Sequence, residues 1–249
     1  SMEIVIASDN VIKFLDSKSD EYTTMSNAIW ALAELGYQEK ETSKLMQSHL
    51  KEENFSINNG VAEIPTAFIA SYGLGKPIIA ILAEMDALPG LSQDAKPERR
   101  IIREQMPGHA CGHNLFGTGS IAASVAVKNW LTETGTTGTI RLYGTPAEED
   151  GSGKVYMVRA GFFHDVHIVL HWHPSDKNDA SPSSSLANKS AKFRFYGIAA
   201  HAAAAPEKGR SALDAVESMN FMVNLMREHL PESARIHYII TNGGAAPNI

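Results

Sequence analysis

The segment KPIIAILAEMDALPG, residues 76–90, predicts a strand that is buried on both faces. From Pro77 to Ala83 its residues are apolar almost without interruption, which is typical of a strand inside a helix-covered sheet. Around it, strand-like apolar runs alternate with helical patterns. The runs cover residues 66–73, 138–150 (where the strand continues into a loop) and 166–174, and the helical patterns cover 19–37, 40–55, 117–135 and 151–163. This alternation predicts an α/β fold with a mostly parallel, helix-flanked sheet.

A serine-rich segment, residues 181–190, is typical of a hinge or linker. Beyond it the pattern changes to a strand, a helix and a second strand, over residues 191–201, 211–230 and 234–242. This fragment predicts a second, smaller domain. We therefore expect two domains, residues 1–187 and 188–249.

The composition excludes some classes of partner. The chain has 249 residues and a net charge of −6, which argues against nucleic acid because phosphate binding needs clustered Lys and Arg. No run approaches the roughly 18 apolar residues of a membrane-spanning helix, so no membrane partner is expected. The single cysteine, Cys111, cannot form an internal disulfide, which favours a reducing compartment, the cytoplasm.

Polar side chains capable of metal binding or proton transfer follow the predicted strands. They are Asp86, His109, Cys111, His113, Glu148, Glu149, His171 and His173. Parallel strands place their carboxyl ends at one edge of a sheet, where α/β proteins bind ligands. Thiolates, imidazoles and carboxylates are the ligands of zinc and similar metals. Adjacent residues point opposite ways in extended backbone, so we expect one of Glu148 and Glu149 to bind metal and the other to carry protons.

Other interpretations of the same residues remain open. A lone cysteine is often a small core residue, and a pair of adjacent glutamates is often a solvated surface feature. Cys111 could instead be a nucleophile activated by a histidine. The histidines two residues before and after it are poorly placed for this in extended backbone, which leaves His173. The interpretation of Cys111 as a nucleophile assigns no role to Glu148 and Glu149.

Five ordered motifs resemble those of the aminoacylase/carboxypeptidase-type dinuclear metallopeptidases. They are AEMDALPG (83–90), GHACGHNLFGTG (108–119), TPAEEDGSGK (145–154), WHP (172–174) and GIAAHAAAAPEKGRSALDA (197–215). They look most like the amidohydrolase branch, which contains aminobenzoyl-glutamate hydrolases, N-acyl-amino-acid amidohydrolases and plant auxin-conjugate hydrolases. The resemblance covers the chain from about residue 20 to Ile249.

The resemblance implies a fold, a cofactor and a reaction. The fold is an α/β zinc-peptidase domain with an inserted ferredoxin-like lid, of which residues 188–249 would be the first half, and the lid forms a homodimer. The cofactor is a pair of divalent metal ions, zinc or manganese. The reaction is hydrolysis of the amide bond of N-acyl amino acids or dipeptide-like substrates such as aminobenzoyl-glutamate.

The resemblance also implies roles for individual residues. The metal ligands would be Cys111, His113, Glu149 and His173, with His171 as the alternative to His173. Glu148 would be the general base that deprotonates a metal-activated water. His201 would reach the active site of the partner protomer, and Asn248 would contact substrate. His109 is interpreted as supporting the ligands from behind.

The sequence departs from the family pattern in three respects. Asp150 stands where the family commonly has glycine, and His167 replaces an acidic residue at a strand start. The family's chain also continues past the last residue here and supplies a final histidine ligand. A second hypothesis is therefore a truncated, catalytically inactive subunit that only binds metal or assists assembly.

Overall fold

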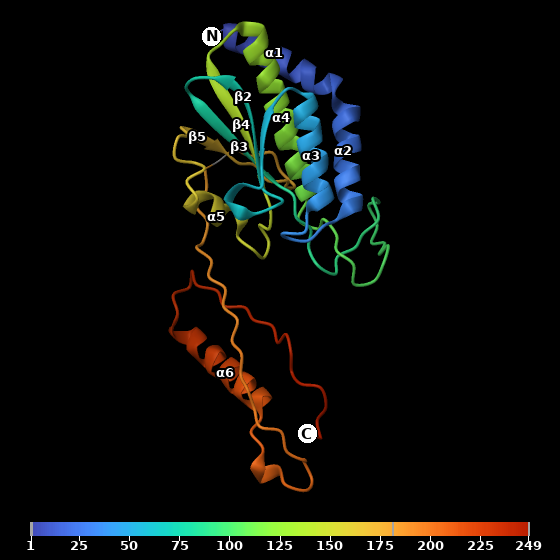
Figure 1. Ribbon diagram of the computed structural model, residues 1–249, viewed down its shortest axis with the longest axis vertical. Helices are drawn as coiled ribbons and strands as arrows, with labels where there is room; N and C mark the ends of the chain where they lie inside the picture. The colour runs from blue at the N-terminus through green and yellow to red at the C-terminus, as the bar shows by residue number, and fades with distance from the viewer. Residues whose placement is uncertain (1, 181, 249) are drawn as a thin grey trace. The chain divides into compact units, whose positions relative to one another are not determined.

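The computed structural model describes residues 2–180 and 182–248, which form two compact units (Figure 1). The first unit is Ser1–Asp179 and the second is Ala180–Ile249. The serine-rich segment predicted as a hinge lies at the start of the second unit.

The first unit contains five helices, five strands and one short 3-10 helix within its described residues. The helices are α1 (Met2–Ser17), α2 (Ser19–Leu32), α3 (Lys40–Glu52), α4 (His113–Thr134) and α5 (Gly153–Arg159). The strands are β1 (Ser56–Asn59), β2 (Phe68–Leu74), β3 (Ile78–Glu84), β4 (Gly138–Thr145) and β5 (Ile168–Leu170). The 3-10 helix η1 (Val61–Glu63) joins β1 to β2.

The strands form one mixed sheet in the order β1-β2-β4-β3-β5. β3 pairs in parallel with β4 and β5, whereas β2 pairs antiparallel with β1 and β4. The expectation of a mostly parallel sheet is therefore right only for this half of the sheet. The physical reason lies between β2 and β3, because residues 75–77 are too few for the helical crossover that a parallel connection needs.

The sheet buries side chains on both faces, as the unbroken apolar run at 77–83 predicts. Ile81 and Ala83 face the cluster formed with helices α2, α3 and α4, while Ala80 and Leu82 face a second cluster that includes α5. This alternation follows from the two-residue period of a strand. Figure 1 shows α1 to α4 together on one side of the sheet, so the helices are unequally divided between its faces.

The end of α2 and the start of α4 differ from their predicted positions. α2 ends at Leu32, where Ala33 adopts a left-handed conformation with φ 42°, and it does not continue to Gly36. α4 begins at His113, four residues before the predicted start at residue 117, and its N-cap Gly112 has φ 77°. Glycine tolerates this conformation without strain, so the chain turns sharply between Cys111 and His113.

The second unit has one long helix, α6 (Ala212–Met226), and the short 3-10 helices η2 (Pro206–Lys208) and η3 (Arg227–His229). The predicted helix is confirmed, and Ser211 caps it by accepting a hydrogen bond from the Asp214 amide. The strands predicted at 191–201 and 234–242 are absent from the described residues. A strand needs a hydrogen-bonded partner, and here only an isolated bridge joins Ile198 to Arg210.

Neither unit offers a helix that could cross a lipid bilayer: within residues 2–180 and 182–248, none is both long and apolar enough.

Candidate metal centre

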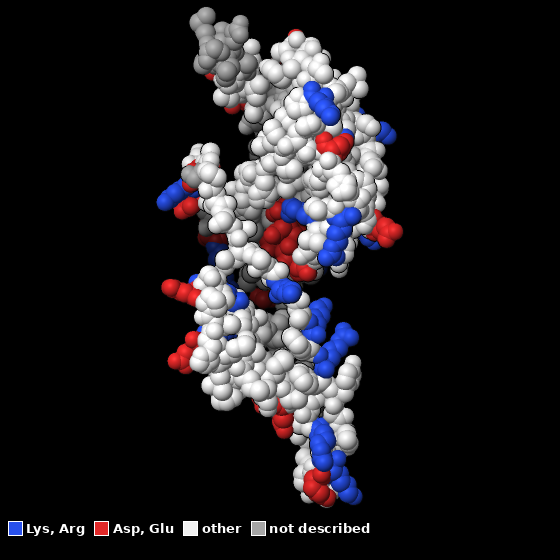
Figure 2. Space-filling model, turned by 90° about the vertical axis from the view of Figure 1, so that its left-hand side faces the viewer, with Lys and Arg blue, Asp and Glu red and all other residues white. Residues whose placement is uncertain are grey.

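Three neighbouring strands deliver polar residues to one edge of the sheet. β4, β3 and β5 are adjacent and parallel, so the residues after Thr145, Glu84 and Leu170 emerge together. Figure 2 shows acidic side chains gathered at one place on the first unit, with a basic side chain beside them. The polar residues that follow these three strands therefore lie at one edge of the sheet.

His113 lies at the centre of the group and is almost fully buried. Its Nδ1 lies 3.0 Å from Asp86 Oδ1 and 2.8 Å from the Asp86 carbonyl oxygen, and its Nε2 lies 3.0 Å from Glu84 Oε2. Burial by itself would lower the pKa of His113, but the contacts with Asp86 and Glu84 outweigh it and raise the pKa to about 10. In the metal-free protein the ring therefore carries a positive charge between carboxylates.

Asp86 also organises the neighbouring strand end. Its Oδ2 accepts a hydrogen bond of 2.9 Å from the backbone amide of Glu149, while its Oδ1 receives His113 Nδ1. A carboxylate that orients the far nitrogen of an imidazole is a common support for metal-binding histidine. Asp86 thus fixes the orientation of His113 and leaves Nε2 facing the other side chains.

Glu148 and Glu149 both reach toward His113. Glu149 Oε1 lies 3.8 Å and Glu148 Oε2 3.9 Å from His113 Nε2. The expectation that adjacent glutamates diverge assumed extended backbone, and it is wrong here because the segment is a turn in which Ala147 has φ 54°. Burial, followed by the charges of Glu84 and Glu149, raises the pKa of Glu148 above the usual range.

Cys111 and His173 complete a potential ligand group with His113, since one ligand atom from each lies within 4.8 Å of the others. Cys111 Sγ is 3.4 Å from His173 Nε2. His173 Nδ1 lies 2.8 Å from the carbonyl oxygen of Pro174, and only an N–H can bond a carbonyl, so Nε2 presents its lone pair to the thiol. Burial, and then the hydrogen bond with Glu149, raises the pKa of Cys111 to about 12.

His171 and His109, the other two histidines expected at this edge, are placed differently. His171 Nε2 lies 3.4 Å from Glu84 Oε1 and stands outside the group formed by Cys111, His113 and His173. His109 is buried, and neither ring nitrogen has a hydrogen-bond partner in the described part of the chain. Burial, followed by the charge of His113, lowers the pKa of His109 to about 4.

Glu84 and Lys154 belong to the site, although sequence reasoning missed both. Glu84 is buried, Lys154 Nζ lies 2.5 Å from its Oε1, and Glu84 forms a second possible ligand group with His113 and Glu148. Burial would raise the pKa of Glu84, but His113 and Lys154 lower it to about 2. A signal was present in the sequence, because Glu84 precedes Asp86 by two residues and the two side chains therefore share one side of the strand end.

The donor set fits a transition-metal cation. Glu149 Oε1 is a buried atom without a hydrogen-bond partner in the described part of the chain, and it lies 3.8 Å from His113 Nε2. Buried polar atoms are rarely left unpaired in proteins, and an absent ion is one explanation for them. A cation bound by both atoms would satisfy the unpaired oxygen of Glu149, and Cys111 and His173 form a possible ligand group with the same His113.

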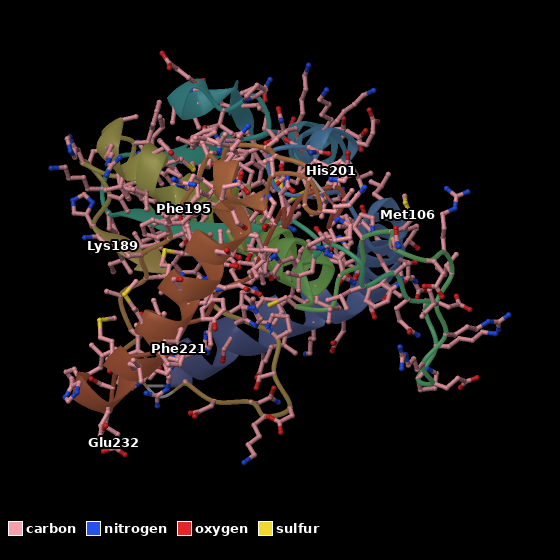
Figure 3. All side chains as sticks on the ribbon, turned by 90° about the horizontal axis from the view of Figure 1, so that it is seen from below. Met106, Lys189, Phe195, His201, Phe221 and Glu232 are labelled. Carbon is pink, nitrogen blue, oxygen red and sulfur yellow. The ribbon has the colours of Figure 1, made fainter. Side chains whose placement is uncertain are left out.

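His201 and Asn248 lie in the second unit, where both are exposed. Figure 3 labels His201, which lies on the loop before η2. Its Nδ1 accepts hydrogen bonds of 3.2 Å from the backbone amides of Ala203 and Ala204, so Nε2 carries the proton. The carbonyl oxygen of Asn248 accepts a hydrogen bond from the amide of Ala202, which brings these two predicted residues into one part of the unit.

Comparisons with known proteins give a family match and several relatives. The model of peptidase family M20/M25/M40 matches residues 80–240. One subunit of the p-aminobenzoyl-glutamate hydrolase of Escherichia coli K12 is 47% identical over 237 residues, covering 94% of this chain and 49% of that protein. The chain spans about half the length of the curated relatives it matches.

Two solved structures resemble the chain. YXEP protein of Bacillus subtilis, described as a dinuclear metal binding peptidase from M20 family, matches at 29% identity and a TM-score of 0.50, over 63% of this chain and 43% of that one. An aminobenzoyl-glutamate utilization protein from Klebsiella pneumoniae matches with a TM-score of 0.61 over 96% of this chain and 65% of that one. At 18% identity the second likeness bears on the fold alone.

Proposed function

The chain belongs to peptidase family M20/M25/M40, and from this premise we propose that it forms part of a metal-dependent amidohydrolase. The substrates would be N-acyl amino acids or dipeptide-like amides such as aminobenzoyl-glutamate, a choice supported by the likeness to the Escherichia coli hydrolase. The observation that carries the proposal is the convergence of Cys111, His113 and His173, with the unpaired buried Glu149 Oε1 3.8 Å from His113 Nε2.

Cys111, His113, Glu149 and His173 would hold the metal, which we propose to be a pair of zinc or manganese ions. When bound, such ions polarise the scissile carbonyl and lower the pKa of a bound water to about 7. The chain's own part is to orient these ligands. Asp86 does so by bonding both His113 Nδ1 and the amide of Glu149.

Glu148 is the group we propose as general base. Its carboxylate lies 3.9 Å from His113 Nε2 and is partly exposed to solvent. Its pKa is raised by burial and by neighbouring acids, which makes it a better proton acceptor than an ordinary glutamate. It would take a proton from the attacking water and deliver it to the leaving nitrogen.

The second unit would supply the remaining contacts. We propose that residues 188–249 are the first half of a ferredoxin-like lid through which the protein forms a homodimer. His201, with the proton on Nε2, would donate to the oxyanion at the partner's site, a contribution of about 3 kcal/mol. Asn248 would contact substrate. A cytoplasmic location would keep Cys111 reduced.

The experiment is hydrolysis of aminobenzoyl-glutamate by the purified protein, before and after chelation and after zinc or manganese is restored. We expect activity that disappears with chelation and returns with metal. Glu148→Gln should abolish turnover while zinc content is unchanged. Asp165→Asn, which alters an ion pair with Arg141 outside the site, should keep both turnover and zinc content. Hydrolysis that chelators do not affect, or no hydrolysis with metal bound, would overturn the proposal.

A further inference from the structure

The loop between α2 and α3, residues 33–39, bonds both segments that carry the carboxylates of the site. We call this loop the strap. Near its start, the carbonyl oxygen of Glu34 accepts a hydrogen bond of 2.8 Å from the amide of Ala87, the residue after Asp86. Near its end, two side chains bond the turn at residues 146–151. The strap therefore joins two strand ends that are distant in the sequence.

Glu39 and Tyr37 make the bonds to the turn. Glu39 Oε1 accepts a hydrogen bond of 2.7 Å from the amide of Ala147, and its Oε2 accepts one of 3.2 Å from Thr66 Oγ1. The hydroxyl of Tyr37 donates to the carbonyl oxygen of Gly151 at 2.5 Å. Glu39 is completely buried, whereas Tyr37 is partly exposed. Both ends of the turn are thus held by the same loop.

The turn has a conformation that its own sequence does not favour. Ala147 has φ 54°, in the left-handed region that residues with a Cβ rarely adopt. The bond from Glu39 falls on the amide of this residue, directly before Glu148. A buried carboxylate whose partners are a backbone amide and a hydroxyl costs free energy, so stability alone is a poor reason for a glutamate here.

We propose that Glu39 and Tyr37 are positioning residues, which hold the turn so that the carboxylates of Glu148 and Glu149 face His113. The effects on metal affinity and on hydrolysis rest on the function proposed above. The effect on the turn does not, because it follows from the hydrogen bonds alone. Neither residue touches the ligand group, so each acts only through the turn.

A matched pair of variants separates hydrogen bonding from volume at residue 39. Burial raises the pKa of Glu39 to about 7, so both the neutral and the ionised form occur near neutral pH, and each offers an acceptor oxygen to Ala147. Glu39→Gln keeps an acceptor at this position. Glu39→Met has a similar size and removes it. Tyr37→Phe removes the second bond at a partly exposed position where misfolding is not expected.

The first test is hydrogen exchange of the peptide covering residues 144–152 in the metal-free protein. We expect Glu39→Met to speed exchange of this peptide at least tenfold and Tyr37→Phe several-fold, while Glu39→Gln stays within twofold of wild type. Glu53→Met is the control, because it removes an ion pair beside the end of α3 that does not involve the turn. It should leave exchange of the peptide unchanged.

The second test is cobalt(II) binding, followed by its visible absorption, together with steady-state kinetics. Glu39→Met should weaken cobalt binding about tenfold, alter the absorption bands and lower kcat with little change in KM, and Glu39→Gln should restore all three. Wild-type exchange and cobalt affinity in both Glu39→Met and Tyr37→Phe would overturn the inference. If the wild-type protein hydrolyses nothing, the proposed function fails, yet the exchange comparison still decides the role of the strap.

Discussion

Binding of zinc to the site should release about two protons for each ion that takes both Cys111 and His113 as ligands. The perturbation is a change of pH between 6.5 and 7.5. In the metal-free protein the pKa of His113 is about 10 and that of Cys111 is about 12, so both hold their protons throughout this interval. A metal binds the deprotonated forms, so it must displace both protons.

The apparent affinity for zinc should therefore rise with pH. Each displaced proton makes the apparent affinity rise about tenfold per pH unit, so two protons give about 100-fold, or about 3 kcal/mol, from pH 6.5 to 7.5. Cys111→Ser removes one of the two protons, so its slope should fall to about tenfold per unit. His164→Gln changes an exposed histidine that belongs to no possible ligand group of the described residues, and it should keep the change in affinity of about 100-fold per pH unit.

The assay is a calorimetric titration with zinc in buffers of different ionisation enthalpy, which counts the protons released. A competing chelator gives the apparent Kd at each pH. Release of no proton, with an affinity that does not change with pH, would refute the assignment of His113 as a ligand. A slope that is the same in wild type and Cys111→Ser would refute the assignment of Cys111.

Three further predictions concern the support of the site and the stability of the fold. Asp86→Asn removes the carboxylate that orients His113, so zinc affinity measured by chelator competition should fall about 10- to 100-fold, and unchanged affinity would contradict this role. Gly144→Ala would place a Cβ 2.2 Å from a ring carbon of the buried Phe68, so urea unfolding should show a loss of about 1–3 kcal/mol, whereas an unchanged midpoint would show that the ring moves freely. Because the pKa of His113 is raised to about 10, the stability it contributes to the metal-free protein is fully present below about pH 6.5 and is lost as the pH rises through 10. In the presence of chelator, the urea midpoint should therefore fall as the pH is raised from 6 to 8 and to 10. A midpoint that stays constant would contradict the positive charge on His113.

Several features of the fold could be predicted from the sequence because they depend on local periodicity. The apolar run at 77–83 identified β3, and the alternation of strands with helices identified the layered α/β fold. The position of acidic residues after β3 and β4 then indicated that they would meet, because parallel neighbours end at the same edge. The roles of Cys111, His113, Glu149 and His173 as metal ligands remain predictions, although the structure brings their side chains together.

Other features depend on contacts that no local pattern contains. The divergence expected of Glu148 and Glu149 fails because their backbone forms a turn. The hydrogen bond between Glu39 and Ala147 spans 108 residues, so no sequence pattern near either residue predicts it. The predicted strands of the second unit lack a partner within the described residues, and apolar alternation alone cannot supply one.

The acidic group around His113 has a consequence for the order in which the protein takes up its ligands. Glu84, Asp86, Glu148 and Glu149 bring four negative charges, and Lys154 and protonated His113 bring two positive ones. The metal-free site therefore has a net negative charge. An acyl amino acid, which carries a carboxylate, would be repelled from it. When His113 is neutral and Cys111 is a thiolate, the four carboxylates and the thiolate outnumber Lys154 by four negative charges. Two divalent cations neutralise these charges. For the anionic substrates proposed above, electroneutrality would thus make uptake of metal a condition for uptake of substrate.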